Sequence, residues 1–204
     1  MISGLTADSV REYPGIDDQE IQVRKAGMRD IGPILELING YAAKGVMLPR
    51  TEFEMSENIR DFSVAMADDQ LLGCGALHFY SPTVGEIRSL AVHEHLKTHG
   101  VGRLLVQGLV AEAVEYSLDA VFAFTYVPDF FRKVRFSEVE RGTLPLKAWK
   151  DCLRCPKFQN CDEIAVLRVL RADHWEQNQP HWEVGSADPD LYVQFPIVSV
   201  VPRR

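Results

Sequence analysis

The segment LAVHEHLKTHGVGRLL, residues 90–105, constrains the fold of this chain more than any other feature of the sequence. It begins at the end of EIRSLAV, which we interpret as a β-strand, continues through a polar turn, and enters a helix at Gly100 and Gly102. At such a helix start, unpaired main-chain N–H groups and the positive end of the helix dipole favour a bound pyrophosphate. Glycine suits this place because a side chain would block the close approach of the phosphate oxygens.

Two other interpretations compete with a phosphate-binding turn. The glycines could serve only to start or cap the helix, and this alternative stays open. A dinucleotide-binding turn is excluded, because the segment lacks G-x-G-x-x-G and its strand follows a hairpin instead of opening the fold.

The remaining patterns predict strands and helices that alternate around one sheet. The polar residues DDQ separate two strands of a hairpin, 63–67 and 71–80. The other expected strands lie at 21–26, 86–92, 120–126 and 163–170. The stretch 120–126 is nearly all apolar, which suits a strand covered on both faces. The fold class is therefore α/β or α+β.

Several residues are candidates for the starts and faces of the helices. Asp30 is a candidate N-cap for a first helix, and Ser56 for a short second one. Pro128 suits the first position of another short helix. The helix at 100–116 is expected to bury one face, formed by Val101, Leu104, Leu105, Gly108 and Ala111.

Length and charge limit the class of protein. A chain of 204 residues suits one well-buried domain, which we place at 21–170, between an N-terminal arm at 1–20 and an extension at 171–204. The net charge of −7 argues against nucleic acid as the partner, because proteins that neutralise phosphates along a duplex are normally basic. We find neither a secretory signal pattern nor a stretch long enough to span a membrane, and expect a cytoplasmic protein.

The glycine turn and a later segment resemble a known family. KTHGVG is similar to motif A of the GNAT acetyltransferases, R/Q-x-x-G-x-G/A, with Lys97 in place of arginine or glutamine. VPDFFRKVRF resembles the family segment F-Y-x-K-x-G-F, with Phe131 in place of tyrosine and Arg135 in place of glycine. The resemblance implies the GNAT fold, a mixed and mostly antiparallel sheet flanked by helices, and acetyl-CoA as the acetyl donor. The donor-binding residues that it implies are Leu90, Ala91, Val92, Lys97, Thr98, His99, Gly100, Val101, Gly102 and Arg103.

A closer resemblance, over residues 21–170, is to the short-form N-acetylglutamate synthases, which are amino-acid N-acetyltransferases. It rests on VMLPR, GEIRSLAV, LPLKAWKDC and CPKFQNCDEIAV. It implies acetylation of the amino group of L-glutamate, the entry step to arginine biosynthesis. The alternatives are a GNAT enzyme for another amine, such as a peptide lysine or a polyamine, and a non-catalytic acyl-CoA sensor.

The resemblance also implies catalytic roles. The amide of Val92 would face the thioester oxygen as it gains charge. Glu86 would act as general base, directly or through water, although the sequence alone equally allows an ordinary surface carboxylate. Because Phe131 replaces the usual acid, Tyr126 or a water molecule is the candidate that protonates the thiolate.

A pocket for a dicarboxylate should hold an arginine, because a guanidinium matches a planar carboxylate. Arg50 corresponds to a substrate-binding arginine of the family. Arg88 alternates with Glu86 on the same face of its strand, which suits a pocket wall. Lys147 and Lys150 are further candidates, and each of these cations could instead be an ordinary solvated charge.

The cysteine-rich loop and the tail complete the expectations. Three of the four cysteines lie within DCLRCPKFQNCDE, at Cys152, Cys155 and Cys161. Structural zinc normally takes four ligands, and Cys74, His78 or Asp162 could complete a site only if the loop folds back on the 71–80 strand. We expect no metal, and a loop whose thiols pack as small apolar groups. The apolar tail 190–204 should pack on its own domain or on a second subunit of a homodimer.

Overall fold

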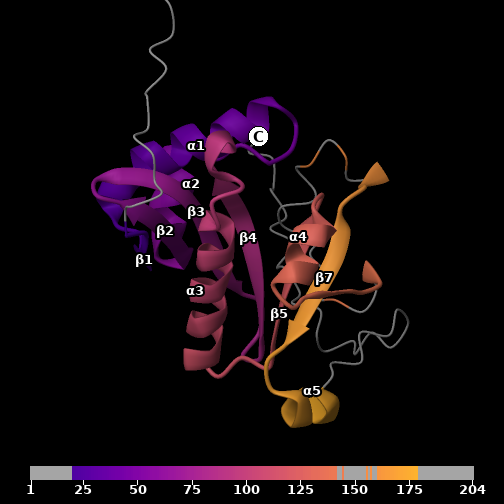
Figure 1. Cartoon of the computed structure of the whole chain (residues 1–204). Helices are drawn as coiled ribbons and strands as arrows, with labels where there is room; N and C mark the ends of the chain where they lie inside the picture. The colour runs from indigo at the N-terminus through magenta and orange to yellow at the C-terminus, as the bar shows by residue number, and fades with distance from the viewer. Residues whose placement is uncertain (1–19, 142–143, 145–154, 156, 158–159, 179–204) are drawn as a thin grey trace, which may run out of the picture.

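The computed structural model describes residues 20–141, 144, 155, 157 and 160–178. Its centre is one seven-stranded sheet in the order β1-β2-β3-β4-β5-β7-β6 (Figure 1). The strands are β1 (Gln22–Lys25), β2 (Phe62–Ala67), β3 (Gln70–Phe79), β4 (Val84–Val92), β5 (Ala120–Thr125), β6 (Ser137–Glu138) and β7 (Ile164–Val169). All neighbouring strands are antiparallel except β4 and β5, which are parallel. The predicted sheet, mixed and mostly antiparallel, is confirmed.

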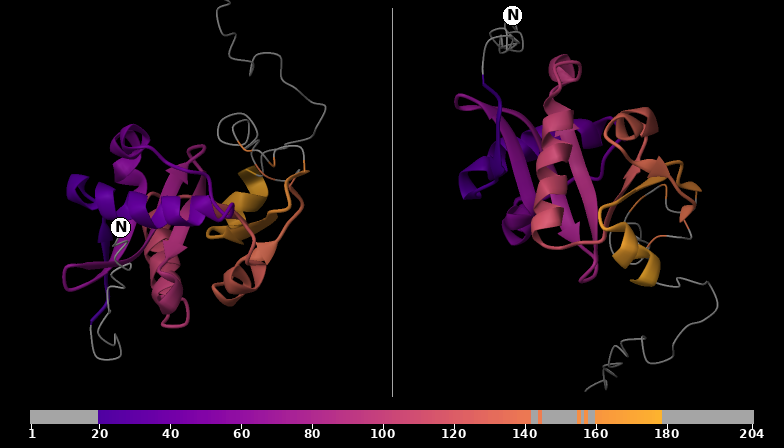
Figure 2. Two further views of the ribbon diagram at one scale, coloured as in Figure 1. Left: turned by 90° about the horizontal axis from the view of Figure 1, so that it is seen from above. Right: turned by 60° about the horizontal axis from the view of Figure 1, so that its bottom comes forward.

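Helices cover both faces of this sheet (Figure 2). In the described part of the chain the α-helices are α1 (Ile31–Ala43), α2 (Glu52–Asn58), α3 (Val101–Glu115), α4 (Pro128–Lys133) and α5 (Ala172–Asn178). Helices α1 and α2 pack on one face, where Ile34 and Met55 join Val64 and Cys74 in one apolar cluster. Helices α3 and α4 pack on the other face. None of these helices is long and apolar enough to cross a membrane.

Helix α5 lies in the predicted extension and packs against the sheet. Trp175 is buried in a cluster with Val84, Phe122, Leu144 and other residues on the α1 side of the sheet. The same face of the sheet is therefore covered by α1 and α2 over β2 to β4 and by α5 and Leu144 nearer β5 and β7.

The predicted cap of α2 is wrong. The helix begins at Glu52, so Ser56 lies inside it. Thr51 accepts a hydrogen bond from the Glu54 amide at 3.2 Å, and the Glu54 carboxylate accepts one from the Thr51 amide at 3.0 Å. This reciprocal pair satisfies two amides at once and forms a capping box, which a single serine at position 56 would not.

Asp30 precedes α1 as predicted but does not cap it with its side chain. Its carboxylate instead accepts a hydrogen bond from the Gly27 amide at 2.7 Å and forms two bonds with the Arg24 guanidinium, at 2.7 and 2.9 Å. Asp30 therefore fastens the turn Met28–Asp30 to strand β1.

Helix α3 occupies the predicted residues, and Val101 and Leu105 of the predicted face are buried, but the rest of the buried face differs. The residues that it buries are Val101, Leu105, Val106, Leu109, Val110 and Ala113. Leu104 and Ala111, predicted to be buried, are exposed. The helix carries apolar residues on more than one stripe, so the position of the sheet decides which stripe is covered. A β carbon at Gly108 would lie 3.0 Å from Val23 Cγ1, so glycine lets the helix approach β1 closely.

Strand β4 contains a β-bulge that the sequence does not reveal. Between Arg88 and Ala91 it has two residues where β3 has only Gly75. Ser89, the first of the two, has a φ of 52°, in the left-handed region. The extra residue shifts the alternation of the strand, so Leu90 packs on the α3 side and Ala91 on the α1 side.

Candidate active site

Strands β4 and β5 form a fork in the middle of the sheet. They pair over three positions only, the last of which places Glu86 opposite Phe122. Beyond it, β4 continues to Val92 and β5 to Thr125 with no pairing between them in the described residues. Figure 1 shows the two strands diverging towards the end of the sheet at which α3 begins. One edge of β4 therefore faces the fork instead of a neighbouring strand.

Helix α3 starts at the open end of this fork. Its N-cap, Gly100, has a φ of 80° and carries no side chain that could cap the first amides. A β carbon at Gly102 would lie 3.3 Å from Phe130 Cζ of α4, so space beside the first turn is limited. The first amides of an α-helix lack partners within the helix. This start therefore fits the pyrophosphate of a coenzyme A donor.

The predicted donor-binding residues follow one continuous path from β4 to α3. Leu90, Ala91 and Val92 end the strand, Lys97, Thr98 and His99 are exposed after the turn Glu94–Leu96, and Gly100, Val101, Gly102 and Arg103 open the helix. The side chain of Val101 is fully buried in the core, so only its main chain is available to a ligand.

The amide of Val92 points into the fork. His93 donates its amide hydrogen to the Leu72 carbonyl oxygen on β3 at 3.1 Å. Hydrogen-bonded and non-hydrogen-bonded pairs alternate along antiparallel strands. The next pair, Val92 with Gly73, is therefore of the second kind, and the Val92 N–H points away from β3. This direction fits the predicted contact with a thioester oxygen.

Tyr41 links α1 to the same path. Its hydroxyl donates a hydrogen bond to the Val92 carbonyl oxygen at 2.6 Å. The Lys97 ammonium lies 5.0 Å from the centre of its ring, within the range of a cation–π contact. Lys44 lies 5.8 Å from the same ring centre and forms an ion pair with Glu94 at 2.7 Å. Tyr41 thus fixes both the end of β4 and the cation at the first position of the predicted motif.

Glu86 lies where the fork begins and is only 1% exposed. Its register partners are His78 on β3 and Phe122 on β5, so its side chain lies on the α1 face of the sheet. The interpretation of Glu86 as an ordinary surface carboxylate is therefore wrong. Arg88, two residues further on the same face, is also largely buried, with 9% of its side chain exposed.

A polar cluster lies beside Glu86 on this face. The Asp61 carboxylate lies 2.8 Å from His78 Nδ1, and the same oxygen lies 3.7 Å from Arg88 Nη2. Asp61 ends the turn Ile59–Asp61, immediately before β2. Asp61 is not among the site residues predicted from the sequence, and His78 is predicted there only as a candidate metal ligand. The available signal was a histidine within the otherwise apolar strand 71–80.

Arg50 lies in the segment between α1 and α2, and Asn39 of α1 holds its main chain. The Arg50 amide donates to Asn39 Oδ1 at 2.9 Å, and Asn39 Nδ2 donates to the Arg50 carbonyl oxygen at 3.0 Å. The side chain of Arg50 is half-buried. Lys147 and Lys150, the other two predicted acceptor contacts, lie outside the described residues.

Tyr126 follows the end of β5 and contacts Lys157, which is not among the site residues predicted from the sequence. Lys157 donates a hydrogen bond to the Tyr126 hydroxyl at 3.3 Å and lies 4.8 Å from the centre of its ring. Burial raises the pKa of Tyr126 above its usual value, and the bond from Lys157 opposes this in part. Tyr126 therefore keeps its proton at neutral pH, as a proton donor must.

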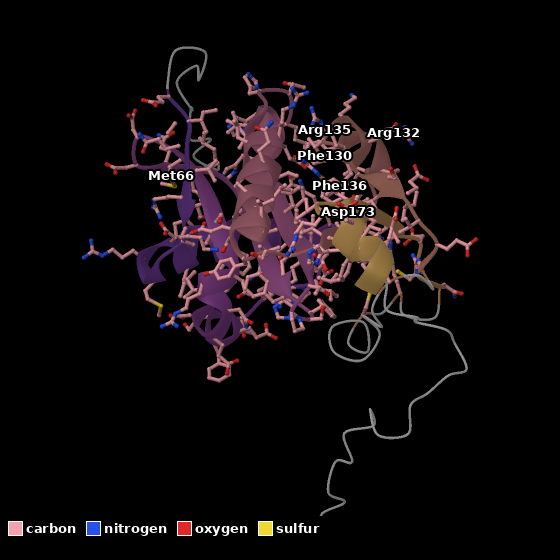
Figure 3. All side chains as sticks on the ribbon, turned by 90° about the horizontal axis from the view of Figure 1, so that it is seen from below. Met66, Phe130, Arg132, Arg135, Phe136 and Asp173 are labelled. Atoms are coloured by element: carbon pink, nitrogen blue, oxygen red, sulfur yellow. The ribbon has the colours of Figure 1, made fainter. Side chains whose placement is uncertain are left out.

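The two departures from the F-Y-x-K-x-G-F pattern have structural consequences. Phe131 is 3% exposed and packs in the core with Phe136, so this position supplies no acid. Arg135 is exposed and has a φ of 71°, the conformation that glycine would adopt without cost. Figure 3 shows Arg135 and Arg132 towards the outer side of α4, with Phe130 and Phe136 further in.

The described cysteines do not form a metal site. In the ranges that the structure describes, no three histidine, cysteine or acidic residues gather as metal ligands would. Cys74 is fully buried under α1, and burial raises the pKa of its thiol to about 12. Cys155 and Cys161 are half-buried free thiols, and Cys152 lies outside the described residues.

Comparison with known sequences gives relatives of one family. Residues 37–138 match the model of the acetyltransferase (GNAT) family. An uncharacterized N-acetyltransferase of Chlorobaculum tepidum is 42% identical over 148 residues, which are 72% of this chain and 96% of the relative. The amino-acid acetyltransferase of Mycobacterium tuberculosis is 35% identical over 135 residues, 65% of this chain and 77% of the relative. For the amino-acid acetyltransferase of Aliivibrio fischeri, at 30% identity, the chain spans only 38% of the relative.

Solved structures agree with these relatives. N-acetylglutamate synthase from Neisseria gonorrhoeae, complexed with coenzyme A and N-acetyl-glutamate, aligns with a TM-score of 0.67 at 25% identity, over 76% of this chain and 36% of that one. A Mycobacterium tuberculosis protein in complex with CoA aligns with a TM-score of 0.62 at 28% identity, over 73% of this chain and 99% of that one. The chain therefore belongs to the GNAT acetyltransferase family, and it is an N-acetyltransferase whose acetyl donor is acetyl-CoA.

Proposed function

We propose that the protein acetylates the α-amino group of L-glutamate. The observation that carries the proposal is the buried carboxylate of Glu86 at the fork, with the largely buried guanidinium of Arg88 on the same face. An acid beside an arginine suits an acceptor that brings both an amine and carboxylates. The names of the relatives, amino-acid acetyltransferases, and the N-acetyl-glutamate complex of the Neisseria gonorrhoeae synthase support the same acceptor.

In this proposal acetyl-CoA enters the fork from the end at which α3 begins. The first amides of α3 bind its pyrophosphate, with Lys97 nearby as a point charge. The amide of Val92 donates to the thioester oxygen, which gains negative charge in the transition state. The donor and the amine are thereby held together, which removes much of the entropic cost of their encounter.

Proton transfers in the proposed reaction involve residues on both strands of the fork. Glu86 removes a proton from the ammonium group, directly or through water. The free amine attacks the thioester carbon, the carbon–sulfur bond breaks, and the thiolate of coenzyme A leaves while the nitrogen loses its second proton to water. Tyr126 or a water molecule returns a proton to that sulfur. The raised pKa of Tyr126 fits this role because its hydroxyl stays protonated at neutral pH.

Arg50 and Arg88 bind the carboxylates of the acceptor in this proposal. Each guanidinium offers a planar pair of donors to a carboxylate. Asn39 fixes the main chain at Arg50 through two hydrogen bonds, which limits where its side chain can reach. Lys147 and Lys150 remain predicted further contacts.

The direct test is an assay of acetyl-CoA consumption with single acceptors. L-glutamate, L-glutamine, other amino acids, a lysine peptide and a polyamine are compared at equal concentration, and the acetylated product is identified by mass. We expect the highest kcat/KM with L-glutamate. A preference for the lysine peptide or the polyamine would replace the proposal with the other class of amine.

Two variants test the assigned roles in the same assay. Glu86→Gln should lower kcat about 10²- to 10⁴-fold, the usual contribution of a positioned base.

Arg50→Ala should raise KM for glutamate far more than KM for acetyl-CoA, because a substrate carboxylate loses its charged partner, at a cost of about 2–5 kcal/mol. Equal effects on both KM values would exclude Arg50 as an acceptor contact.

A further inference from the structure

We propose that Asp61 and His78 act as a positioning pair that orients the guanidinium of Arg88 towards the acceptor carboxylate. The inference rests on the proposed function, since it concerns how the same pocket selects its substrate. Neither residue needs to touch the acceptor: both are positioning residues that act through Arg88.

The three side chains meet at one carboxylate oxygen. Asp61 Oδ2 lies 2.8 Å from His78 Nδ1 and 3.7 Å from Arg88 Nη2. The histidine bond is of ordinary length, so it fixes the carboxylate. The contact with Arg88 is longer than a hydrogen bond, so Asp61 attracts the guanidinium without forming a bidentate pair with it. Asp61 therefore orients the arginine without occupying both donors of its guanidinium.

The register of three strands explains why these residues meet. Arg88 pairs with Ala76 on β3, and Ala76 in turn pairs with Phe62 on β2. Asp61 directly precedes Phe62, and His78 lies two residues after Ala76 on the same face. The same face carries Glu86, opposite His78. The cluster is thus built from β3, β4 and the turn that leads into β2, which lie side by side in the sheet.

Burial makes this arrangement effective. The exposed fractions of the side chains are 9% for Arg88, 22% for His78 and 28% for Asp61. Charges attract each other more strongly at such sites than in water, because water screens them less. An arginine that is already oriented loses less side-chain freedom when the ligand binds, and this improves the binding of the matching ligand.

The consequence is selectivity between a carboxylate and a carboxamide. A fixed guanidinium presents two parallel donors, which match both oxygens of a carboxylate but only the one oxygen of an amide. A mobile guanidinium would adapt to either group. We therefore expect the Asp61–His78 pair to favour glutamate over glutamine.

The experiment compares Asp61→Asn with wild type and with Glu112→Gln as the matched control. Glu112 also forms an ion pair, 2.7 Å from Lys25, but it lies on α3, on the opposite face of the sheet. KM and kcat are measured for glutamate, glutamine and acetyl-CoA, and thermal unfolding of each variant is recorded.

We expect Asp61→Asn to raise KM for glutamate about tenfold. Loss of a residue that orients a metal ligand commonly lowers metal affinity about 10- to 100-fold, and we take the low end of that range for a residue that orients an arginine. KM for acetyl-CoA should stay within twofold of wild type, and the preference for glutamate over glutamine should fall. Glu112→Gln should change none of the three. An unchanged or lower KM for glutamate in Asp61→Asn would overturn the inference, because Asp61 would then be inert or would only neutralise Arg88.

A second variant keeps the test decisive if Asp61→Asn does not fold. His78→Ala leaves Asp61 and Arg88 in place and removes only the ring that holds the carboxylate. It should show the same division between the two KM values, and an unchanged KM for glutamate in folded His78→Ala would also overturn the inference. If wild type itself does not acetylate glutamate, the proposed function fails, and this outcome is distinct from a failure of the positioning role.

Discussion

Arg135 shows how one residue can fit a fold at a cost. It follows the end of α4, where its amide donates to the Arg132 carbonyl oxygen and the next amide, of Phe136, donates to that of Phe131, both at 3.1 Å. These bonds close the helix end and require a left-handed residue between them. A residue with a β carbon loses about 1–2 kcal/mol in that conformation.

We predict that Arg135→Gly stabilises the protein. Relief of the left-handed strain is offset in part by the larger freedom of glycine in the unfolded chain, which leaves about 0.5–1 kcal/mol. Urea denaturation measures the change. Lys133→Gly is the matched control, because Lys133 is the exposed last residue of the same helix, and glycine there should destabilise by about 0.5–1 kcal/mol. Lower stability of Arg135→Gly would mean that Arg135 forms contacts that outweigh the strain.

Asp30 gives a pH-dependent prediction. Its hydrogen bonds with Arg24 hold the pKa of this carboxyl below its usual value of 3.8, although burial opposes the shift. A lowered pKa in the folded state means that the stabilisation is present above the unfolded pKa and is lost as the pH falls through the folded one. Asp30→Asn should therefore lower the free energy of unfolding at pH 7 by about 1 kcal/mol, as for a surface ion pair with a capping bond.

The difference between wild type and Asp30→Asn should shrink as the pH is lowered from 5 to 2, because the wild-type carboxyl then becomes neutral as well. Chemical denaturation at several pH values measures it. A difference that stays constant over this range would show that the carboxyl makes its contribution without its charge.

Local patterns located single residues only where the partners lie nearby in the sequence. Pro128 does open α4, as predicted. Thr51 was missed in favour of Ser56, although Glu54 three residues later completes its capping box. The cluster of Asp61, His78 and Arg88 joins three separate segments, and no spacing rule along one strand or helix could indicate it.

At the scale of elements, most strands and helices could be predicted because each is a single periodic stretch. The hairpin of β2 and β3 lies where DDQ indicated it, and β5 is buried on both faces as its apolar sequence implied. The strand β6 is too short to show a periodic pattern, and it is defined by its pairing with β7. The parallel pairing of β4 and β5, which creates the fork, depends on how far α3 carries the chain and not on the residues of either strand.

The start of α3 yields a prediction about donor binding. Gly102→Glu should weaken acetyl-CoA binding, because it adds both bulk beside Phe130 and a negative charge near a bound pyrophosphate. Gly102→Gln is the matched control, with the same bulk and no charge. The charge alone should account for about a tenfold difference in Kd between the two variants, measured by calorimetry. Equal affinities would mean that the pyrophosphate lies elsewhere.

At the scale of the whole molecule, the sheet consists of two parts that three residue pairs join. One part is β1 to β4 with α1 to α3, and the other is β5 to β7 with α4 and α5, as Figure 2 shows. A ligand that lies between β4 and β5 therefore contacts both parts. Its binding therefore stabilises the association of the two parts.

We predict that acetyl-CoA stabilises the fold and protects the fork. At a free concentration a hundredfold above Kd, it should raise the free energy of unfolding by about 2.7 kcal/mol. Amide hydrogen exchange should slow in 87–92 and 123–126 more than in the hairpin of β2 and β3, which has its partners without the ligand. Uniform slowing over the whole sheet would show that the donor does not lie in the fork.

The bulge at Ser89 also affects how this chain can change in length. Each residue in a regular strand decides, by its odd or even place, which side of the sheet every later residue faces. Loss of Ser89 would leave Leu90 alone opposite Gly75, so Leu90 would still face α3 and Ala91 would still face α1. The bulge therefore holds one additional residue without turning any later side chain of β4 to the other face of the sheet. Evolution by deletion of one residue is thus open at the bulge, as it is at the turn between β2 and β3.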